Sequence, residues 1–361
     1  MPEFPRTFDV VVTGGGPAGS ATALLLARAG ISALLLECSS EKVRAVGETL
    51  PPAASSLLRN LGVWDTFLRD NHLPSPGVVS VWGSFQPQLK DSSSIDGEGW
   101  SIDRARFDTT LRERGRDEGV CVALGARITS CEPRDGQDWS VTFARHHKQH
   151  RVSARYLVDA TGKTGTPALQ CLPSRVVRDN LIGVVRSFHT EQANSYALVE
   201  AVEEGWFYST SVPNHHLIVV YFSDADIYAH GCKSNRSYLR AQLETAANTL
   251  ERVAPSKPAG EPLIVSAATS ARRTVAGRAW IAVGDAALSF DPLSSLGIFK
   301  ALDSATRASE SILDFLRSEV ADPSYQYWSN HVFENYLTNQ RRFYSRERRW
   351  PGSEFWKRRH N

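Results

Sequence analysis

The chain has 361 residues, a formal net charge of +2, 42% hydrophobic residues and 22% charged residues, values that fit a globular enzyme of about two domains. No run approaches the roughly eighteen apolar residues that a membrane-spanning helix requires. The first strand begins by Phe8, which leaves no room for a secretory signal. We therefore expect a cytoplasmic protein without a membrane span.

The five cysteines are odd in number, scattered and without CxxC spacing, which argues against both a disulfide framework and a zinc site. His146, His147 and His150 fall at an expected hairpin end. Their proximity alone does not make a metal site, because carboxylate or cysteine partners are missing. We therefore expect no bound metal.

Residues 8–37 read as a complete dinucleotide-binding unit: an apolar strand, a glycine-rich turn, an alanine- and leucine-rich helix and a second strand. In such a unit Gly14 makes the tight turn and Gly16 lets the backbone approach a pyrophosphate. Gly19 lets the helix and the strand pack closely. The order of these elements makes the pattern far more specific than a glycine-rich turn alone.

The helix of this unit begins near Pro17 and Ala18, so its free N–H groups face the expected phosphates. Glu37, eighteen residues after Gly19, is placed to accept ribose hydroxyls and would repel a 2′-phosphate. We expect Cys38 and Arg127 at the same end of the cofactor.

After this unit the sequence becomes rich in strands before strand and helix alternate again, which indicates a nucleotide-binding domain with an insertion. Hairpin-like runs predict an antiparallel flap beside a parallel sheet: residues 120–124, 139–143 and 151–158. Alternating strands predict a substrate-facing sheet: residues 182–188, 196–202, 206–212 and 217–222. A helix at 237–253 and a strand at 263–268 follow.

A second cofactor signal lies in residues 279–301, where the strand ending at Val283 runs into Gly-Asp-Ala-Ala, a proline-containing loop and Gly-Ile before a helix. This segment resembles the second FAD motif of flavoprotein monooxygenases shaped like p-hydroxybenzoate hydroxylase. The resemblance implies that Asp285 accepts a ribityl hydroxyl and that Pro292, Gly297 and Ile298 lie against the isoalloxazine. N–H groups and a helix dipole there can stabilise negative charge on reduced flavin.

Two further segments resemble motifs of the same superfamily. Residues 156–162 resemble the strand end that contacts the dinucleotide, which implies cofactor contacts from Asp159 and Gly162. Residues 99–108 resemble its strand-to-helix arginine motif, which implies that Arg104 faces the flavin. The alternative is a surface arginine at a helix start that is capped by the preceding aspartate.

The resemblance implies an α/β fold: a Rossmann-like FAD-binding domain of the glutathione reductase type, with an inserted antiparallel β-sheet substrate domain and C-terminal helices. We expect the FAD-binding domain in residues 1–77, 100–175 and 272–320. The substrate-facing sheet is expected in residues 78–99 and 176–271, and the C-terminal helical segment in residues 321–361.

Gly47-Glu48 resembles a glutamate motif near the flavin ring in the halogenase branch, although a structural role fits Glu48 equally well. Tryptophan halogenases carry GWxWxIP, whereas residues 205–213 have a longer interval before the proline. Residues 63–82, where the catalytic lysine of halogenases would align, contain no lysine. These two departures make halogenation the less favoured reaction.

Residues 205–213, 291–295 and 350–359 instead resemble the LodB/GoxB and QhpG-like flavoproteins, which act on a partner protein while a tryptophan-derived quinone cofactor forms. The resemblance implies an FAD-dependent monooxygenase that hydroxylates a tryptophan side chain of a precursor protein. For the catalytic site we expect Trp206 and Tyr208 as stacking partners, Pro292 and Gly297 beside the ring, and Glu48, His215 and His216 as proton handlers. The two histidines sit in a turn, where solvated loop residues are the more common finding.

Two other functions stay open: a small-molecule halogenase or reductase, and a flavin-bearing maturation chaperone. No second dinucleotide fingerprint appears, so we expect an external reductant or a reductase to supply electrons. The basic, aromatic stretch 341–359 lacks a nucleic-acid-binding pattern. We favour a helix that packs its aromatic residues on the body, with a docking surface for a partner protein as the alternative.

Overall fold

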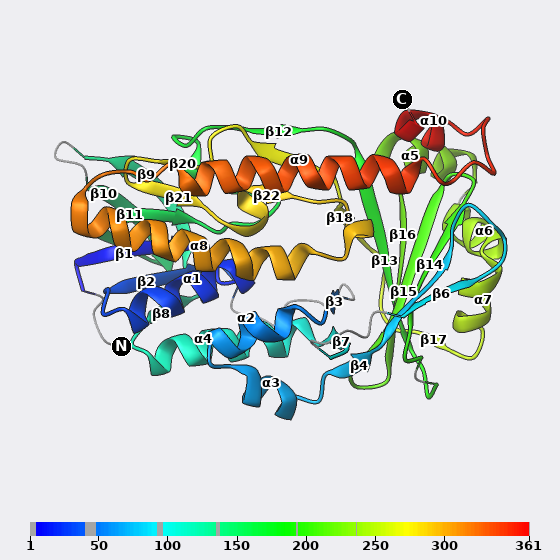
Figure 1. Cartoon of the computed structure of the whole chain (residues 1–361), viewed down its shortest axis with the longest axis horizontal. Helices are drawn as coiled ribbons and strands as arrows, with labels where there is room; N and C mark the ends of the chain where they lie inside the picture. The colour runs from blue at the N-terminus through cyan, green and yellow to red at the C-terminus, as the bar shows by residue number, and fades with distance from the viewer. Residues whose placement is uncertain are drawn as a thin grey trace.

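The computed structural model describes residues 5–39, 48–91, 97–134, 138–192, 194–235 and 237–360. The described chain contains two eight-stranded sheets and two three-stranded sheets. Figure 1 shows one large sheet in each half of the molecule, with the long helices α8 (Gly297–Ser318) and α9 (Ser324–Tyr344) running along the first half. The expected α/β fold is therefore confirmed.

The first sheet has a parallel centre in the order β21, β11, β1, β2 and β8, with the β9–β10 hairpin and β20 added. Helices α1 and α4 flank it together with α8. Val10, Val11 and Val12 of β1 are fully buried, because crossover helices cover a parallel sheet on both faces. The elements are β1 (Thr7–Thr13), α1 (Pro17–Arg28), β2 (Ala33–Glu37), α4 (Arg104–Asp117), β8 (Cys121–Leu124), β9 (Arg127–Pro133), β10 (Trp139–Arg145), β11 (Lys148–Asp159), β20 (Ala276–Gly277) and β21 (Trp280–Ala282).

One strand that was predicted in the antiparallel flap belongs to the parallel part of the first sheet. Residues 120–124, expected in the antiparallel flap, supply β8, which pairs in parallel with β2. The partner of β10 is β9, which starts after a turn at Gly125, where φ is 67°. Periodicity could not separate the two possibilities, because a short apolar run fits a buried parallel strand as well as a hairpin strand.

The second sheet follows the order β17, β13, β16, β15, β14, β5 and β6, with β18 also paired to β13. All four strands expected between residues 182 and 222 are present in it. The sheet consists of β5 (Gly77–Val81), β6 (Gln88–Asp91), β13 (Leu181–His189), β14 (Ala197–Val202), β15 (Gly205–Val212), β16 (His216–Asp224), β17 (Lys257–Pro258) and β18 (Leu263–Ser266).

Helices α5 (Ala225–Ser234), α6 (Tyr238–Thr245) and α7 (Ala247–Val253) lie beside this sheet. The single helix expected at 237–253 is broken at Ala246, where φ is −101° and ψ is 80°. The break has a tertiary cause: the buried Glu200 carboxylate of β14 accepts hydrogen bonds from the backbone N–H groups of Asn248 and Thr249. Such a carboxylate satisfies the first N–H groups of α7 and fixes its start.

Short elements connect the two halves. They are β3 (Glu48–Leu50), α2 (Ala54–Asn60), α3 (Trp64–Arg69), β4 (Leu73–Ser75), β7 (Gly99–Ile102), η1 (Pro167–Leu169), β12 (Arg175–Val177), β19 (Ser270–Arg272), η2 (Gly284–Ala286), β22 (Leu288–Ser289) and η3 (Pro292–Ser294). None of the helices in the described residues is both long and apolar enough to cross a membrane. The predicted domain boundaries stay a prediction.

The C-terminal stretch packs on the second sheet, which confirms the favoured interpretation of its aromatic residues. Phe355 and Trp356 of α10 (Glu354–His360) are fully buried, and the indole of Trp356 donates to the carbonyl of Val202 at 3.0 Å. Arg359 donates to the buried Asp224 carboxylate at 2.7 Å. Part of the basic charge of this stretch is therefore used inside the protein.

We predict that Trp356→Ala lowers the free energy of unfolding by about 3–5 kcal/mol, because it removes a large, fully buried side chain. Tyr327→Ala, at a position that is 69% exposed, should change it by less than about 0.5 kcal/mol. Urea unfolding followed by circular dichroism measures both. Equal free energies of unfolding for the two variants would contradict the packing role of α10 and favour the alternative, a docking surface for a partner protein.

Candidate active site

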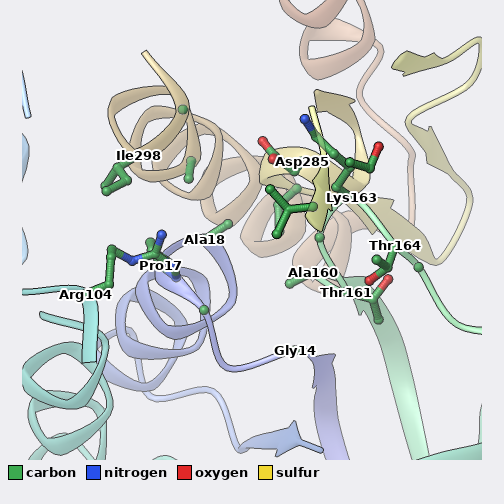
Figure 2. Close-up of a pocket in the computed structure, with 18 of the residues that line it drawn as sticks. Gly14, Pro17, Ala18, Arg104, Ala160, Thr161, Lys163, Thr164, Asp285 and Ile298 are labelled. Atoms are coloured by element: carbon green, nitrogen blue, oxygen red, sulfur yellow. The ribbon is translucent and has the colours of Figure 1, made fainter. Parts of the chain in front are cut away.

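A cavity of about 700 Å³ extends from the glycine-rich turn after β1 to the second sheet. One end is lined by the turn and by Glu37 and Arg127, and the other by Tyr208, Val220 and Phe222. Figure 2 shows the central part, where side chains from α1, α4, α8 and the loop after β11 converge. The cavity thus joins both sheets.

The glycine-rich turn has the geometry that the sequence predicts. Gly14 has a φ of 108°, and a Cβ there would lie 2.2 Å from the carbonyl oxygen of Ala160. A Cβ on Gly19 would lie 1.9 Å from the carbonyl oxygen of Gly14, so helix and strand touch at this residue. A Cβ on Gly16 would meet nothing within 4 Å, which leaves an open cradle over the N-terminus of α1. Gly16, Pro17 and Ala18 line the cavity.

This open cradle fits a dinucleotide, because its walls are backbone N–H groups and a carboxylate rather than side chains that would fill the space. The Glu37 carboxylate accepts the N–H of Gly15 at 2.6 Å and the N–H of Ser39 at 2.7 Å. Cys38 and Arg127 line the same end. Glu37, Cys38 and Arg127 therefore lie together at this end of the cavity, whereas Gly19 does not line it.

Arg112 of α4 was not predicted to lie near the glycine-rich turn, yet its guanidinium donates to the carbonyl of Gly15 at 2.9 Å. The bond holds the glycine-rich turn from outside the cavity. No local signal marks this residue, since 97 positions separate the two partners.

Asp285, at the start of η2, lies on the opposite wall, where Figure 2 shows it beside Lys163. The buried Lys300 of α8 donates to its Oδ1 at 2.7 Å. Burial raises the pKa of the Asp285 carboxyl, but the charges of Lys300 and Lys163 outweigh this effect, so the pKa lies below its usual value. Asp285 therefore lines the cavity as a carboxylate that is paired with Lys300. The sequence did not point to either lysine.

Asp159 requires a correction. It is fully buried and does not line the cavity. Its carboxylate accepts the N–H of Thr161 at 3.0 Å and forms an ion pair with the buried Arg272. Asp159 therefore holds the wall of the cavity in place without facing it, whereas the neighbouring Gly162 does line the cavity.

The helix cap expected from the arginine motif is present, but Arg104 is not a surface residue. Asp103 caps α4 by accepting the N–H of Arg106 at 3.1 Å. Arg104 lines the cavity, with a side chain that is 14% exposed and ion-paired to Asp108 at 3.1 Å. The cap orients the first turn of α4, so that Arg104 projects into the cavity.

The loop before α8 is held by α9. The buried Asp291 accepts the hydroxyl of Tyr344 at 2.6 Å, and its own N–H donates to the hydroxyl of Tyr336 at 2.8 Å. Burial raises the pKa of the Asp291 carboxyl, although the hydrogen bond from Tyr344 opposes the shift. Ser295 in this loop adopts a left-handed φ of 51°. The two tyrosines, far along the chain, were not expected from the sequence.

Pro292, Gly297 and Ile298 line the cavity where this loop meets α8. A Cβ on Gly297 would meet nothing within 4 Å, so a flat ring can approach the backbone there. The beginning of a 22-residue helix also provides N–H groups and the positive end of its dipole.

The far end of the cavity is apolar, with Val185, Tyr208, Val220, Phe222 and Val265 in its wall. Trp206, expected to stack on a substrate, is only 1% exposed and does not line the cavity. Its indole stacks on Phe222 at a centroid distance of 4.1 Å and donates to the hydroxyl of Tyr344 at 3.2 Å. Trp206 thus supports the wall, and Tyr208 alone of the pair lines the cavity.

The expected proton handlers are not brought together. His215 has a φ of 59° and a side chain that is 66% exposed, and neither it nor His216 lines the cavity. Glu48 pairs with Ile102 through its backbone in β3, while its side chain and Gly47 lie outside the described residues. The solvated-loop interpretation fits His215. His216 instead begins β16, where it is half-buried and its Nδ1 lies 3.3 Å from the hydroxyl of Ser187.

Comparison with known proteins identifies the family. The family described as FAD binding domain matches residues 7–324. A putative FAD-dependent oxidoreductase from Marinomonas mediterranea, LodB, is 31% identical over 364 residues, covering 98% of this chain and 97% of that protein.

Two solved structures share the fold. The myxobacterial chondrochloren halogenase CndH has a TM-score of 0.91 at 24% identity, with 98% of this chain and 86% of CndH covered. The peptidyl tryptophan dihydroxylase QhpG, essential for tryptophylquinone cofactor biogenesis, has a TM-score of 0.79 at 24% identity, with 98% of this chain and 79% of QhpG covered. The chain therefore belongs to the FAD binding domain family and is an FAD-dependent oxidoreductase related to LodB, with the fold that CndH and QhpG share.

Proposed function

We propose that the protein is a monooxygenase that hydroxylates the indole ring of a tryptophan side chain in a precursor protein. The observation that carries this proposal is the continuous cavity, which joins a dinucleotide cradle to an apolar end. The likeness to LodB over nearly the full length of both chains supports it. The printed activity of QhpG, a peptidyl tryptophan dihydroxylase, suggests the substrate class.

The residues that would hold FAD follow from the cavity. Gly14, Gly16 and the N-terminus of α1 would bind the pyrophosphate, and Glu37 the ribose. Asp285 would accept a ribityl hydroxyl. Residues 292–298 would lie against the isoalloxazine. When bound and reduced, FAD supplies the two electrons with which dioxygen is activated.

The chain itself would contribute positioning and exclusion of water. Val185, Val220 and Phe222 make an apolar wall that fits the flat, apolar indole ring. Tyr208, on the same wall, is suited to stack on the ring. N–H groups at Gly297 and Ile298 would stabilise negative charge on the cofactor. We further propose that the reductant is external, as the sequence predicts.

Halogenation is the second candidate, favoured by the close agreement of the fold with that of CndH. Against it, the apolar end has no lysine among the described residues that line it. The single described lysine in the cavity wall, Lys163, comes from the loop after β11 and faces Asp285.

Gly16→Val is expected to give folded but colourless protein, because the added side chain would occupy the open cradle without meeting other atoms of the chain. Gly352→Val is the matched control, since a Cβ there also meets nothing within 4 Å and the residue does not line the cavity. The FAD-to-protein absorbance ratio and the apoprotein melting temperature measure both effects. Full FAD content in Gly16→Val would contradict the assigned cradle.

Asp285→Ala should weaken FAD binding by about 10- to 100-fold, the equivalent of a lost hydrogen bond to a charged group. Asp285→Asn keeps a hydrogen-bond acceptor, so its FAD affinity should fall less than that of Asp285→Ala. Asp303→Ala, which removes a solvent-facing ion pair with Arg307 on α8, should bind FAD normally. Titration of apoprotein with FAD, followed by quenching of flavin fluorescence, gives the three dissociation constants; equal values would remove Asp285 from the site.

The reaction is tested with FAD-loaded protein, a flavin reductase with NADH, dioxygen, bromide and either N-acetyltryptophanamide or a tryptophan-containing hexapeptide. We expect the peptide to gain one or two oxygen atoms that carry ¹⁸O when ¹⁸O₂ is supplied. The Gly16→Val variant should give no product. A brominated product would instead establish the halogenase, and peptide binding without oxygen uptake would establish the chaperone.

A further inference from the structure

We propose that the free edge of β18 binds an extended segment of the partner protein as an added strand and so presents one of its side chains to the cavity. The inference rests on the proposed function and names how its protein substrate is held. Figure 1 shows β18 next to β13, near the junction between the two halves of the molecule.

The direction of the backbone groups of β18 follows from its pairing. β18 pairs with β13 alone, with Val265 opposite Gly183, and the N–H of the following Ala267 donates to the carbonyl of Leu181 at 2.9 Å. Because successive residues of an antiparallel strand turn their N–H and C=O groups to opposite sides, those of Ile264 and Ser266 point away from β13. In the described part of the chain no other strand pairs with this side.

The edge also lacks the usual protection. Exposed strand edges are normally guarded by charged residues, proline or bulges, because they can pair with other chains. The opposite edge of this sheet, β6, carries Lys90 and Asp91, and β17 consists of Lys257 and Pro258. By contrast, β18 has the sequence Leu-Ile-Val-Ser, and Ile264 is 56% exposed. An uncharged, exposed edge of this kind is what strand addition requires.

The edge is continuous with the cavity. Val265 and Ser266 both line it, and so does Ser295 of the loop before α8. Ser266 and Ser295 are also exposed, so this part of the cavity lining lies at the protein surface. Leu296, 39% exposed, adds apolar surface next to Ser295. A strand added to β18 would therefore lie beside this part of the cavity.

Strand geometry then selects one side chain of the bound segment. Residues opposite each other on neighbouring strands direct their side chains to the same face of the sheet. The side chain of Val265 packs with Val220 and Phe222 at the apolar end of the cavity. The residue opposite Val265 would point into that end, and we assign this position to the target tryptophan. A free indole has no backbone with which to use the edge, so the edge selects a polypeptide.

The experiment compares Ser266→Pro with Ser266→Ala in FAD-loaded protein. Proline removes an N–H that faces away from β13, a substitution that edge strands tolerate, and alanine keeps that N–H. The probe is a dye-labelled hexapeptide with tryptophan at its third position between valine and threonine residues, followed by fluorescence polarisation. Loss of one hydrogen bond should weaken peptide binding about fivefold in Ser266→Pro and less than about twofold in Ser266→Ala. Competition with N-acetyltryptophanamide should be equal in both variants.

A second measurement uses wild-type protein and therefore tests the proposal even if the proline variant does not fold. A peptide N-methylated at the residues flanking its tryptophan loses the reciprocal bonds, in which its own N–H groups would donate to the carbonyls of Ile264 and Ser266, and it should bind wild-type protein more weakly than the parent peptide. Equal binding of parent and methylated peptides, or binding of free indole but no peptide, would overturn the proposal. Edge-dependent binding without incorporation of oxygen would leave the docking strand standing and refute the proposed reaction.

Discussion

The buried ion pair between Asp159 and Arg272 is the interaction on which the cavity depends. Asp159 ends β11, and Arg272 lies in β19, more than a hundred residues later. Arg272 also donates to the carbonyls of Ala286 and Pro173. One guanidinium therefore joins the end of a central strand, the loop after η1 and the second cofactor motif. Removal of one partner from such a buried pair typically costs about 3–5 kcal/mol.

Helix α9 makes the second connection. Tyr336, Gln340 and Tyr344 lie four residues apart on one face of the helix, and all three contact Asp291 or its surroundings in the loop before α8. Tyr344 also accepts the indole N–H of Trp206 from the second sheet. The loop that lines the ring end of the cavity is thus fixed from both halves of the molecule. Its position depends on tertiary contacts more than on its own sequence.

Local chemistry explains which parts the sequence could predict. Gly14, Gly16 and Gly19 act through backbone conformation within six residues, so their roles can be read from spacing, and the same holds for the Asp285 turn. The apolar alternation that defines the second sheet is equally local. Asp159 was wrongly predicted to contact the cofactor. Its ion-pair partner Arg272 is more than a hundred residues away in the sequence, so spacing could not reveal the pair.

Trp206 was misplaced for a related reason. Alternation places Trp206 and Tyr208 on the same face of β15, the face that also carries Phe222 and Val220. It does not tell which position on that face lines the cavity and which is covered by the C-terminal stretch. The hairpin partner of β10 and the break before α7 also depend on distant residues. The contacts that fix the loop before α8 share this origin, since they come from residues of α9 that lie 45 to 53 positions away in the sequence.

The close packing of α10 affects how the protein can be handled. The ring of His360, next to the last residue, lies 3.1 Å from the carbonyl oxygen of Tyr344, and the hydroxyl of Tyr344 holds Asp291. An affinity tag fused after His360 would therefore begin two contacts away from the loop before α8, and proteolytic trimming there would disturb the contacts that hold this loop. Purification handles belong at the N-terminus, which Figure 1 shows at the opposite side of the molecule.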